Sequence, residues 1–344
     1  MRKIYTIAKA LNICVKSLSI NPVATYIDKN YHHYTVPDSE DIVLLGMLEE
    51  DPNLILPSNV VELRKNMLYE DTDSLYVKVG SGLLRVLATK DSFKIVYHPC
   101  SDIEVSFFTL EMLLRMYAPM YGLVFTHTAG FILNNKLTVI NAFGGVGKTE
   151  VMMSALNRGA KFIADDFAIM NEFGQIFPYP KMIYLCEYPY DDSLLEKLNR
   201  NKLLWRVYNY CKDRNGFFSK RVAARLESQY FGIKVDYLFV SKEETELKFY
   251  NIDHFYWVDS SDETVFKKIE FEALYNKMML CLDIESRRYF DYDGYFRLKY
   301  PFFNIYKCLQ GKIISSVLDN NTFRGVNIRE RNFEELAKLL FCNN

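Results

Sequence analysis

One stretch determines how the rest of this sequence is interpreted: Asn141-Ala142-Phe143-Gly144-Gly145-Val146-Gly147-Lys148-Thr149. An apolar run, Leu137–Phe143, leads into the glycines, and a helical pattern, Glu150–Arg158, follows them. A strand, a glycine-rich loop and a helix that begins at Gly-Lys-Thr form the P-loop arrangement, in which backbone N–H groups and the helix N-terminus surround a phosphate. The sequence therefore predicts a phosphate-binding loop made of Gly144, Gly145, Val146, Gly147, Lys148 and Thr149.

Two side chains of this loop predict its ligands. Lys148 would reach the β- and γ-phosphates of ATP, and Thr149 would offer its hydroxyl to Mg²⁺. Ala142 stands where the strict motif has its first glycine. A bare Gly-Lys-Thr also arises by chance, so a glycine-rich hairpin end is the alternative interpretation.

A pair of carboxylates follows the loop. Lys161–Ala164 is typical of a buried strand, and it ends at Asp165 and Asp166, 17 and 18 residues after Lys148. A helix and a short return strand fit this interval and can bring the pair back beside the loop. We predict that Asp165 binds the metal and that Asp166 accepts a proton from an attacking hydroxyl. The alternative is a solvated turn at the strand end.

The run from Gly144 to Asp166, GGVGKTEVMMSALNRGAKFIADD, resembles the core of HPr kinase/phosphorylase and related HPr-kinase-like enzymes. These enzymes share their nucleotide-binding core with ATP-dependent phosphoenolpyruvate carboxykinase. The resemblance rests on Gly-Lys-Thr-Glu, Arg158-Gly159, the apolar Phe162-Ile163 and Ala164-Asp165-Asp166 at the family's spacing, and it extends over roughly residues 124–185.

The resemblance implies an α/β fold with a mixed sheet around the loop. It implies that Asp166 takes the place of the catalytic carboxylate, Lys148 that of the P-loop lysine and Thr149 that of the metal-binding hydroxyl. It also makes His127, 15 residues before Ala142, an active-site residue; a strand-start histidine is the alternative. The family's downstream Glu-Ile-Arg-Gly-type motif has no counterpart beyond a weak candidate, Glu187. HPr is therefore not the expected substrate, and the chain is more similar to related kinases such as those of lasso-peptide pathways.

Composition excludes several classes of protein. The 344 residues carry 42 Lys+Arg against 43 Asp+Glu, which argues against nucleic-acid or membrane-surface binding through bulk electrostatics. No apolar run approaches the length of about 20 residues that a spanning helix needs. The seven cysteines are odd in number and lack CxxC spacing, which indicates reduced thiols in a cytoplasmic protein.

Pattern changes along the chain predict two domains. Residues 1–105 are expected to form a smaller β-rich domain, since Ser74–Val79, Leu84–Thr89 and Phe93–Tyr97 have the spacing of a meander around Gly80 and Gly82. Residues 106–344 are expected to form the nucleotide-binding domain, beginning with a helix capped at Thr109. We expect the first domain to select the acceptor.

Further elements are expected downstream. Strands are predicted at Asp166–Asn171, Ile176–Leu185, Val235–Val240 and Glu246–Tyr250, and helices within about 193–230, over Asp262–Cys281 with Asp262 as cap, and over Asn332–Leu340. A basic group in this region could close over the phosphates, although a solvated basic face is the alternative. Its members are Lys212, Arg214, Lys220, Arg221 and Arg225.

Together these features predict an ATP- and Mg²⁺-dependent kinase that phosphorylates a hydroxyl of a peptide, protein or small molecule. A nucleotide-binding regulatory module without transfer is the main alternative, although the Asp165-Asp166 pair disfavours it because binding alone needs no base. A carboxykinase would need a further metal-binding Lys/His/Asp set upstream of the loop, and none is found. The acceptor and a homo-oligomeric state are left open.

Overall fold

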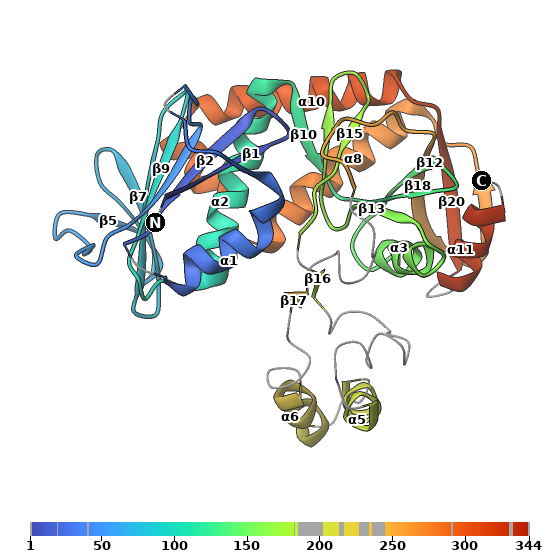
Figure 1. Cartoon of the computed structure of the whole chain (residues 1–344), viewed down its shortest axis with the longest axis horizontal. Helices are drawn as coiled ribbons and strands as arrows, with labels where there is room; N and C mark the ends of the chain where they lie inside the picture. The colour runs from blue at the N-terminus through green and yellow to red at the C-terminus, as the bar shows by residue number, and fades with distance from the viewer. Residues whose placement is uncertain are drawn as a thin grey trace.

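The chain folds into a mixed α/β structure with two large sheets (Figure 1). The computed structural model describes residues 2–18, 20–39, 41–181, 183–184, 202–212, 217–226, 234–235, 245–289, 292–329 and 333–342. Figure 1 shows the sheets at opposite ends of the molecule, with α8 (Phe271–Tyr289) and α10 (Phe302–Asp319) running between them. Within the described parts, no helix is both long and apolar enough to cross a bilayer.

The first sheet has nine strands, all within residues 2–97. In spatial order they are β3 (Thr35–Val36), β1 (Arg2–Ile7), β2 (Leu11–Lys16), β4 (Gly46–Glu50), β9 (Phe93–Tyr97), β8 (Gly82–Ala88), β7 (Ser74–Val79), β6 (Leu68–Glu70) and β5 (Val61–Arg64). The predicted meander is confirmed as β7–β8–β9, and Gly80 takes the positive φ, +59°, that its turn requires.

Two helices, α1 (Pro22–Tyr31) and α2 (Ile103–Tyr117), pack on this sheet. The predicted cap of α2 at Thr109 is wrong. Asp102 caps the helix by accepting a bond from the Val105 N–H at 2.9 Å, and Thr109 donates back to the Val105 carbonyl inside the helix. The helix therefore begins earlier than its apolar periodicity indicated, because a carboxylate satisfies its free N–H groups.

The predicted boundary near residue 105 falls inside α2. A single apolar cluster joins α1 and α2 with β10 (Leu123–Thr126), β14 (Ala168–Asn171), β15 (Ile176–Phe177) and the start of α10. The short 3₁₀ turns His32–Tyr34 and Ala118–Tyr121 follow α1 and α2 respectively. The first sheet thus shares its core with segments on the other side of the predicted boundary.

The second sheet has six strands and contains the strand that leads into the glycine loop. In spatial order they are β13 (Lys161–Ala164), β11 (Thr128–Leu133), β12 (Lys136–Asn141), β18 (His254–Ser261), β20 (Phe323–Arg329) and β19 (Val265–Lys267). The central strands β12, β18 and β20 run parallel. Both faces are covered, by α3 (Lys148–Asn157) and α11 (Phe333–Cys342) on one side and by α8, α10 and the β10-β14-β15 sheet on the other.

Both faces of β12 are covered, so every residue of this strand after Lys136 is buried. Ile140 packs toward α3 and α11, while Leu137 and Val139 pack toward α8 and α10. The predicted hairpin around Asn134 and Asn135 is confirmed as β11–β12. Both asparagines adopt positive φ, 53° and 61°, as a tight two-residue turn requires.

Some downstream predictions need correction. The helix expected from Asp262 begins at Phe271, because Val265–Lys267 pairs with β20 as strand β19. The strand expected at Ile176–Leu185 is cut short after Phe177, where Pro178 lacks an N–H for the ladder. Only Tyr250 of the strand expected at Glu246–Tyr250 pairs with a neighbour, Ile176.

The remaining elements are short. They are β16 (Ile183–Tyr184), β17 (Lys234–Val235), α5 (Lys202–Lys212), α6 (Phe217–Leu226) and α9 (Asp293–Lys299). The helices α5 and α6 lie within the region predicted to be helical. Helix α11 confirms the predicted terminal helix, although Asn332, where that helix was expected to begin, lies outside the described residues. Of the strand expected at Val235–Val240, only Val235 is described.

Candidate active site

The glycine loop connects the end of β12 to the start of α3. Gly145 and Gly147 adopt positive φ, 81° and 92°, which explains why glycine stands at these two positions. The backbone of Ala142 does not adopt a positive φ, so the missing first glycine introduces no strain. The helix begins directly at Lys148, so the free N–H groups of its first turn and the positive end of its dipole face the loop.

The ammonium of Lys148 lies beneath this loop and is almost fully buried, with 7% of the residue exposed. Its Nζ donates to the carbonyl oxygens of Ala142 at 3.0 Å and Phe143 at 3.2 Å. Burial lowers the pKa of Lys148, and the nearby carboxylates of Asp166 and Asp165 oppose that shift. A buried cation in this position favours an anionic ligand at the loop.

Asp165 lies at the end of β13 and reaches the start of α3. Its Oδ1 accepts a hydrogen bond from Thr149 Oγ1 at 2.8 Å. Burial raises the pKa of Asp165 to about 7, and the charge of Asp166 adds to the shift. The structure thus places together the two residues that were predicted to bind the metal.

Asp166 points the other way, toward His127. Its Oδ1 lies 3.4 Å from His127 Nε2, and its side chain is 36% exposed. The two aspartates diverge because Asp166 occupies a three-residue turn closed by a 2.8 Å bond from the Phe167 N–H to the Asp165 carbonyl. Asp166 has a φ of +69°, which is strained for a residue other than glycine.

His127 occupies the short connection between β10 and β11 and is 5% exposed. Its Nδ1 donates to the Ala142 carbonyl at 2.9 Å, and Lys148 Nζ lies 3.4 Å from the same nitrogen. A carbonyl oxygen can only accept, so Nδ1 carries a proton and the Nε2 edge faces Asp166. The structure therefore brings His127, Lys148 and Asp166 together beside the loop.

Helix α8 adds two residues that sequence reasoning missed. Cys281 Sγ lies 3.4 Å from His127 Nδ1, and Glu285 Oε1 lies 3.8 Å from the same atom. Both side chains are buried, and burial raises the pKa of the Cys281 thiol to about 12, so it is not a thiolate nucleophile. Their spacing of four residues on one helix face was the only available signal, and it does not say what that face contacts.

The charges around the loop fit a metal-nucleotide complex better than a nucleotide alone. Among the described side chains, the carboxylates of Asp165, Asp166 and Glu285 surround the single ammonium of Lys148. The described residues contain no group of three or more His, Cys, Asp or Glu side chains that could hold a metal ion by themselves. Mg²⁺ shared between phosphates and one or two protein oxygens suits such a site.

The remaining candidates add no described side chain to this cluster. Glu187 and Arg214 lie outside the described residues, as do the side chains of Lys212 and Arg225. Lys220 and Arg221 are exposed on α6. The cysteines whose side chains are described are free thiols: Cys14, Cys100, Cys211, Cys281 and Cys308.

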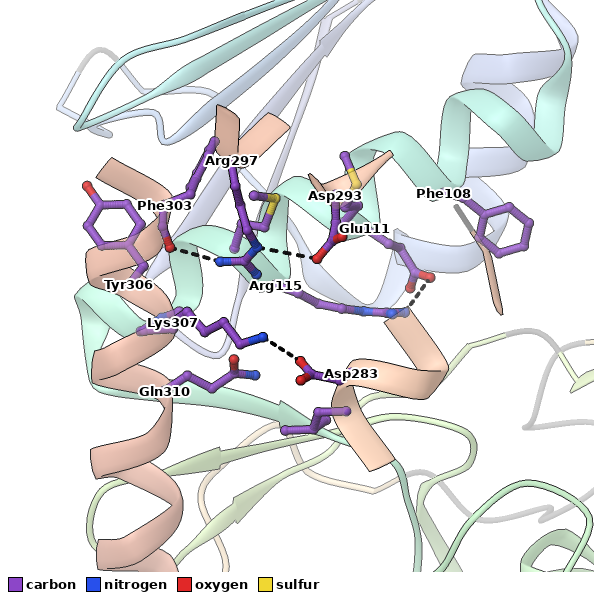
Figure 2. Close-up of a pocket in the computed structure, with 14 residues that line it drawn as sticks. Phe108, Glu111, Arg115, Asp283, Asp293, Arg297, Phe303, Tyr306, Lys307 and Gln310 are labelled. Atoms are coloured by element: carbon purple, nitrogen blue, oxygen red, sulfur yellow. Dashed lines mark hydrogen bonds and ion pairs between the residues drawn. The ribbon is translucent and has the colours of Figure 1, made fainter. Parts of the chain in front are cut away.

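A pocket lies beside the cluster, where α2 meets α8, α9 and α10 (Figure 2). Its apolar lining includes Met112, Met116 and Phe303, and its charged groups are paired. The pairs are Arg115 with Glu111, Arg297 with Asp293 and Lys307 with Asp283. Arg115 links this pocket to the candidate active site, since it stacks on Phe167, the residue that follows Asp166.

The chain matches none of the protein-family models with which it was compared, and the search of curated proteins gave no significant match.

Proposed function

We propose that the protein is an ATP- and Mg²⁺-dependent kinase that transfers the γ-phosphoryl group of ATP to a hydroxyl of a peptide, protein or small molecule. The observation that supports this proposal is that the two adjacent aspartates face different groups. Asp165 bonds to Thr149 at the start of α3, while Asp166, whose side chain is 36% exposed, faces His127. A nucleotide-binding module without transfer needs no second carboxylate beside the loop.

In the proposed reaction, each residue of the cluster has a different role. The loop N–H groups and Lys148 bind the phosphates and stabilise the charge on the transferring group. Asp166 orients the acceptor hydroxyl and takes its proton as the new P–O bond forms. The bond from the γ-phosphorus to the β–γ bridging oxygen breaks, and ADP leaves with the electron pair.

Thr149 and Asp165 would hold Mg²⁺, which supplies charge neutralisation on the β- and γ-phosphates when bound. Their oxygen donors are of the kind that Mg²⁺ prefers, and they already lie 2.8 Å apart. His127 lies against the Asp166 carboxylate through its Nε2 edge and limits the directions that this carboxylate can take.

We also propose that the six-stranded sheet with α3 is an HPr-kinase-like P-loop core. The order of strand, glycine loop, helix, strand and aspartate pair supports this proposal. An acceptor other than HPr, such as a hydroxyl-bearing peptide, is proposed because the family's downstream motif is missing from the sequence.

The test is phosphoryl transfer from ATP labelled at the γ position. We would incubate the full-length protein and Mg²⁺ with a degenerate library of serine- and threonine-containing peptides and with a set of sugars. Labelled acceptor, or labelled phosphate released to water, is the expected result, and both should be lost in Lys148→Ala. Tight Mg-ATP binding without any release of label would instead support the regulatory module.

A further inference from the structure

The strained turn at Asp166 must be held by its surroundings. A positive φ is strained at a residue other than glycine, and it persists only where neighbouring contacts fix it. On one side of the turn, Thr149 holds Asp165. On the other side the chain continues into Phe167, which is 1% exposed.

Arg115 of α2 holds the ring of Phe167. Its guanidinium carbon lies 3.5 Å from the ring centroid, and its Nη2 bonds to Glu111 Oε2 at 3.2 Å. The other side-chain neighbours of Phe167 include His127, whose ring centroid is 5.8 Å away, and Lys181, whose Nζ is 5.3 Å away. Arg115 therefore packs against the residue that follows the proposed base.

Glu111 fixes Arg115 and ties it to the segment downstream of the turn. This carboxylate is 2% exposed and accepts bonds from the Tyr179 hydroxyl at 2.8 Å and from Lys181 Nζ at 3.4 Å. Burial alone would raise the pKa of Glu111, but Lys181 and Arg115 hold it below its usual value. The Glu111 carboxylate thus connects α2 to residues 179–181 through hydrogen bonds and ion pairs.

We propose that Arg115 and Glu111 are positioning residues of the active site. Arg115 fixes the ring of Phe167 by cation–π stacking, and Phe167 in turn fixes the direction of the Asp166 carboxylate. Because α2 packs on the nine-stranded sheet, this contact ties that sheet to the proposed base. The catalytic part of this inference rests on the proposed kinase function.

Arg297 provides a matched control. It lines the same pocket and, like Arg115, pairs with a carboxylate four residues earlier, Asp293, at 3.3 Å (Figure 2). It differs in its second contact, since its Nη1 donates to the Phe303 carbonyl at 3.0 Å and not to the turn. Arg297→Met therefore removes a similar ion pair without touching Phe167.

The experiment compares Arg115→Met and Arg297→Met in two measurements on the full chain. The first is hydrolysis of Mg-ATP, with water in place of the acceptor. We expect Arg115→Met to lower kcat about tenfold with little change in KM, since the contact that fixes the ring of Phe167, and through it the Asp166 carboxylate, is lost. The second is hydrogen exchange at residues 165–168, which should become faster in Arg115→Met and not in Arg297→Met.

Equal kcat in the two variants, or equal exchange at residues 165–168, would overturn the proposal. If Arg115→Met does not fold, Phe167→Leu removes the ring while keeping an apolar side chain, and the same fall in kcat is expected. If the wild-type protein shows no hydrolysis or transfer, the kinase proposal fails, and the exchange measurement alone still decides whether Arg115 holds the turn.

Discussion

Adjacent aspartates at the end of β13 occupy different environments, and this difference is the basis for assigning them different roles. Both side chains are half-buried, but Asp165 accepts a hydrogen bond from Thr149, whereas Asp166 faces His127. A base must reach the acceptor from the open side of the site, whereas a metal ligand lies against the start of the loop helix. The first two predictions separate these roles.

Asp166→Asn should lower phosphoryl transfer about 10²–10⁴-fold with little change in Mg-ATP affinity. The amide keeps the size and much of the hydrogen bonding of the side chain but cannot act as a base. Single-turnover transfer of labelled phosphate measures the effect, with Mg-ATP binding measured in parallel. A near-normal rate for this variant would mean that Asp166 is not the base.

Asp165→Asn should give a transfer defect that lessens at high Mg²⁺, and without Mg²⁺ it should change how stability depends on pH. The raised pKa of Asp165, about 7, means that its ionisation opposes folding. This cost to the free energy of folding is absent below the unfolded-state pKa of the carboxyl, increases as the pH rises and is complete above pH 7. With EDTA present, we expect the Tm of the variant relative to wild type to be a few degrees higher at pH 8 than at pH 5. An equal difference at both pH values would contradict the raised pKa of Asp165.

Lys148→Ala should remove the thermal stabilisation by Mg-ATP and abolish transfer. The buried ammonium is the one described cation placed beneath the loop, so its loss leaves the phosphates without a partner there. Thermal-shift titration measures this, and Lys161→Ala, at an exposed position on β13, is the control. Undiminished stabilisation of Lys148→Ala by Mg-ATP would mean that the loop is purely structural.

At the scale of single elements, the β11–β12 hairpin leads into the glycine loop, and we expect the stability of the hairpin to depend on its two-residue turn. Asn134 and Asn135 adopt φ values of 53° and 61°. Asn135→Gly should be neutral or stabilise by up to about 1 kcal/mol, since glycine adopts positive φ without strain. Asn135→Val should destabilise by about 1–2 kcal/mol, because a β-branched residue resists that conformation. Urea unfolding of both variants is the measurement, and equal midpoints would show that the turn does not limit stability.

Predictions of single helices and strands succeeded where the residues that decide them are close together in the chain, and failed where they are far apart. The hairpin, the loop helix and the meander were predictable because turn residues and apolar periodicity act over a few neighbouring positions. The helix expected from Asp262 failed because Val265–Lys267 pairs with β20, about 60 residues downstream. A local pattern cannot report that a strand partner is available.

At the scale of the whole molecule, the nine-stranded sheet and the loop-bearing region share one apolar core. Phe107 of α2 packs against Tyr26 and Tyr31 of α1, at centroid distances of 5.2 and 5.5 Å. The hydroxyls of Tyr300 and Tyr306 donate to the carbonyls of Val86 and Lys90 at 3.0 and 2.7 Å. Helices near the C-terminus thus hold the first sheet directly.

A chain truncated to begin at Asp102 should therefore fail to fold into a stable nucleotide-binding unit. It would expose the face of α2 that covers the first sheet, and each large apolar side chain exposed costs about 1.5–3 kcal/mol. Soluble yield and cooperative thermal unfolding are the measurements, with the full chain as reference. A cooperative transition that Mg-ATP shifts upward would show that the two predicted parts are independent.

The sequence alone determined the strand, glycine loop, helix and aspartate pair, since each depends on residues close together in the chain. It also placed His127 at the site, through a resemblance and not through any physical rule. Only the tertiary structure placed Glu285 beside His127, 158 residues away in the chain, and Arg115 on Phe167. The physical reason is that periodicity shows which face of a helix is buried, whereas the packing of distant elements decides what that face contacts.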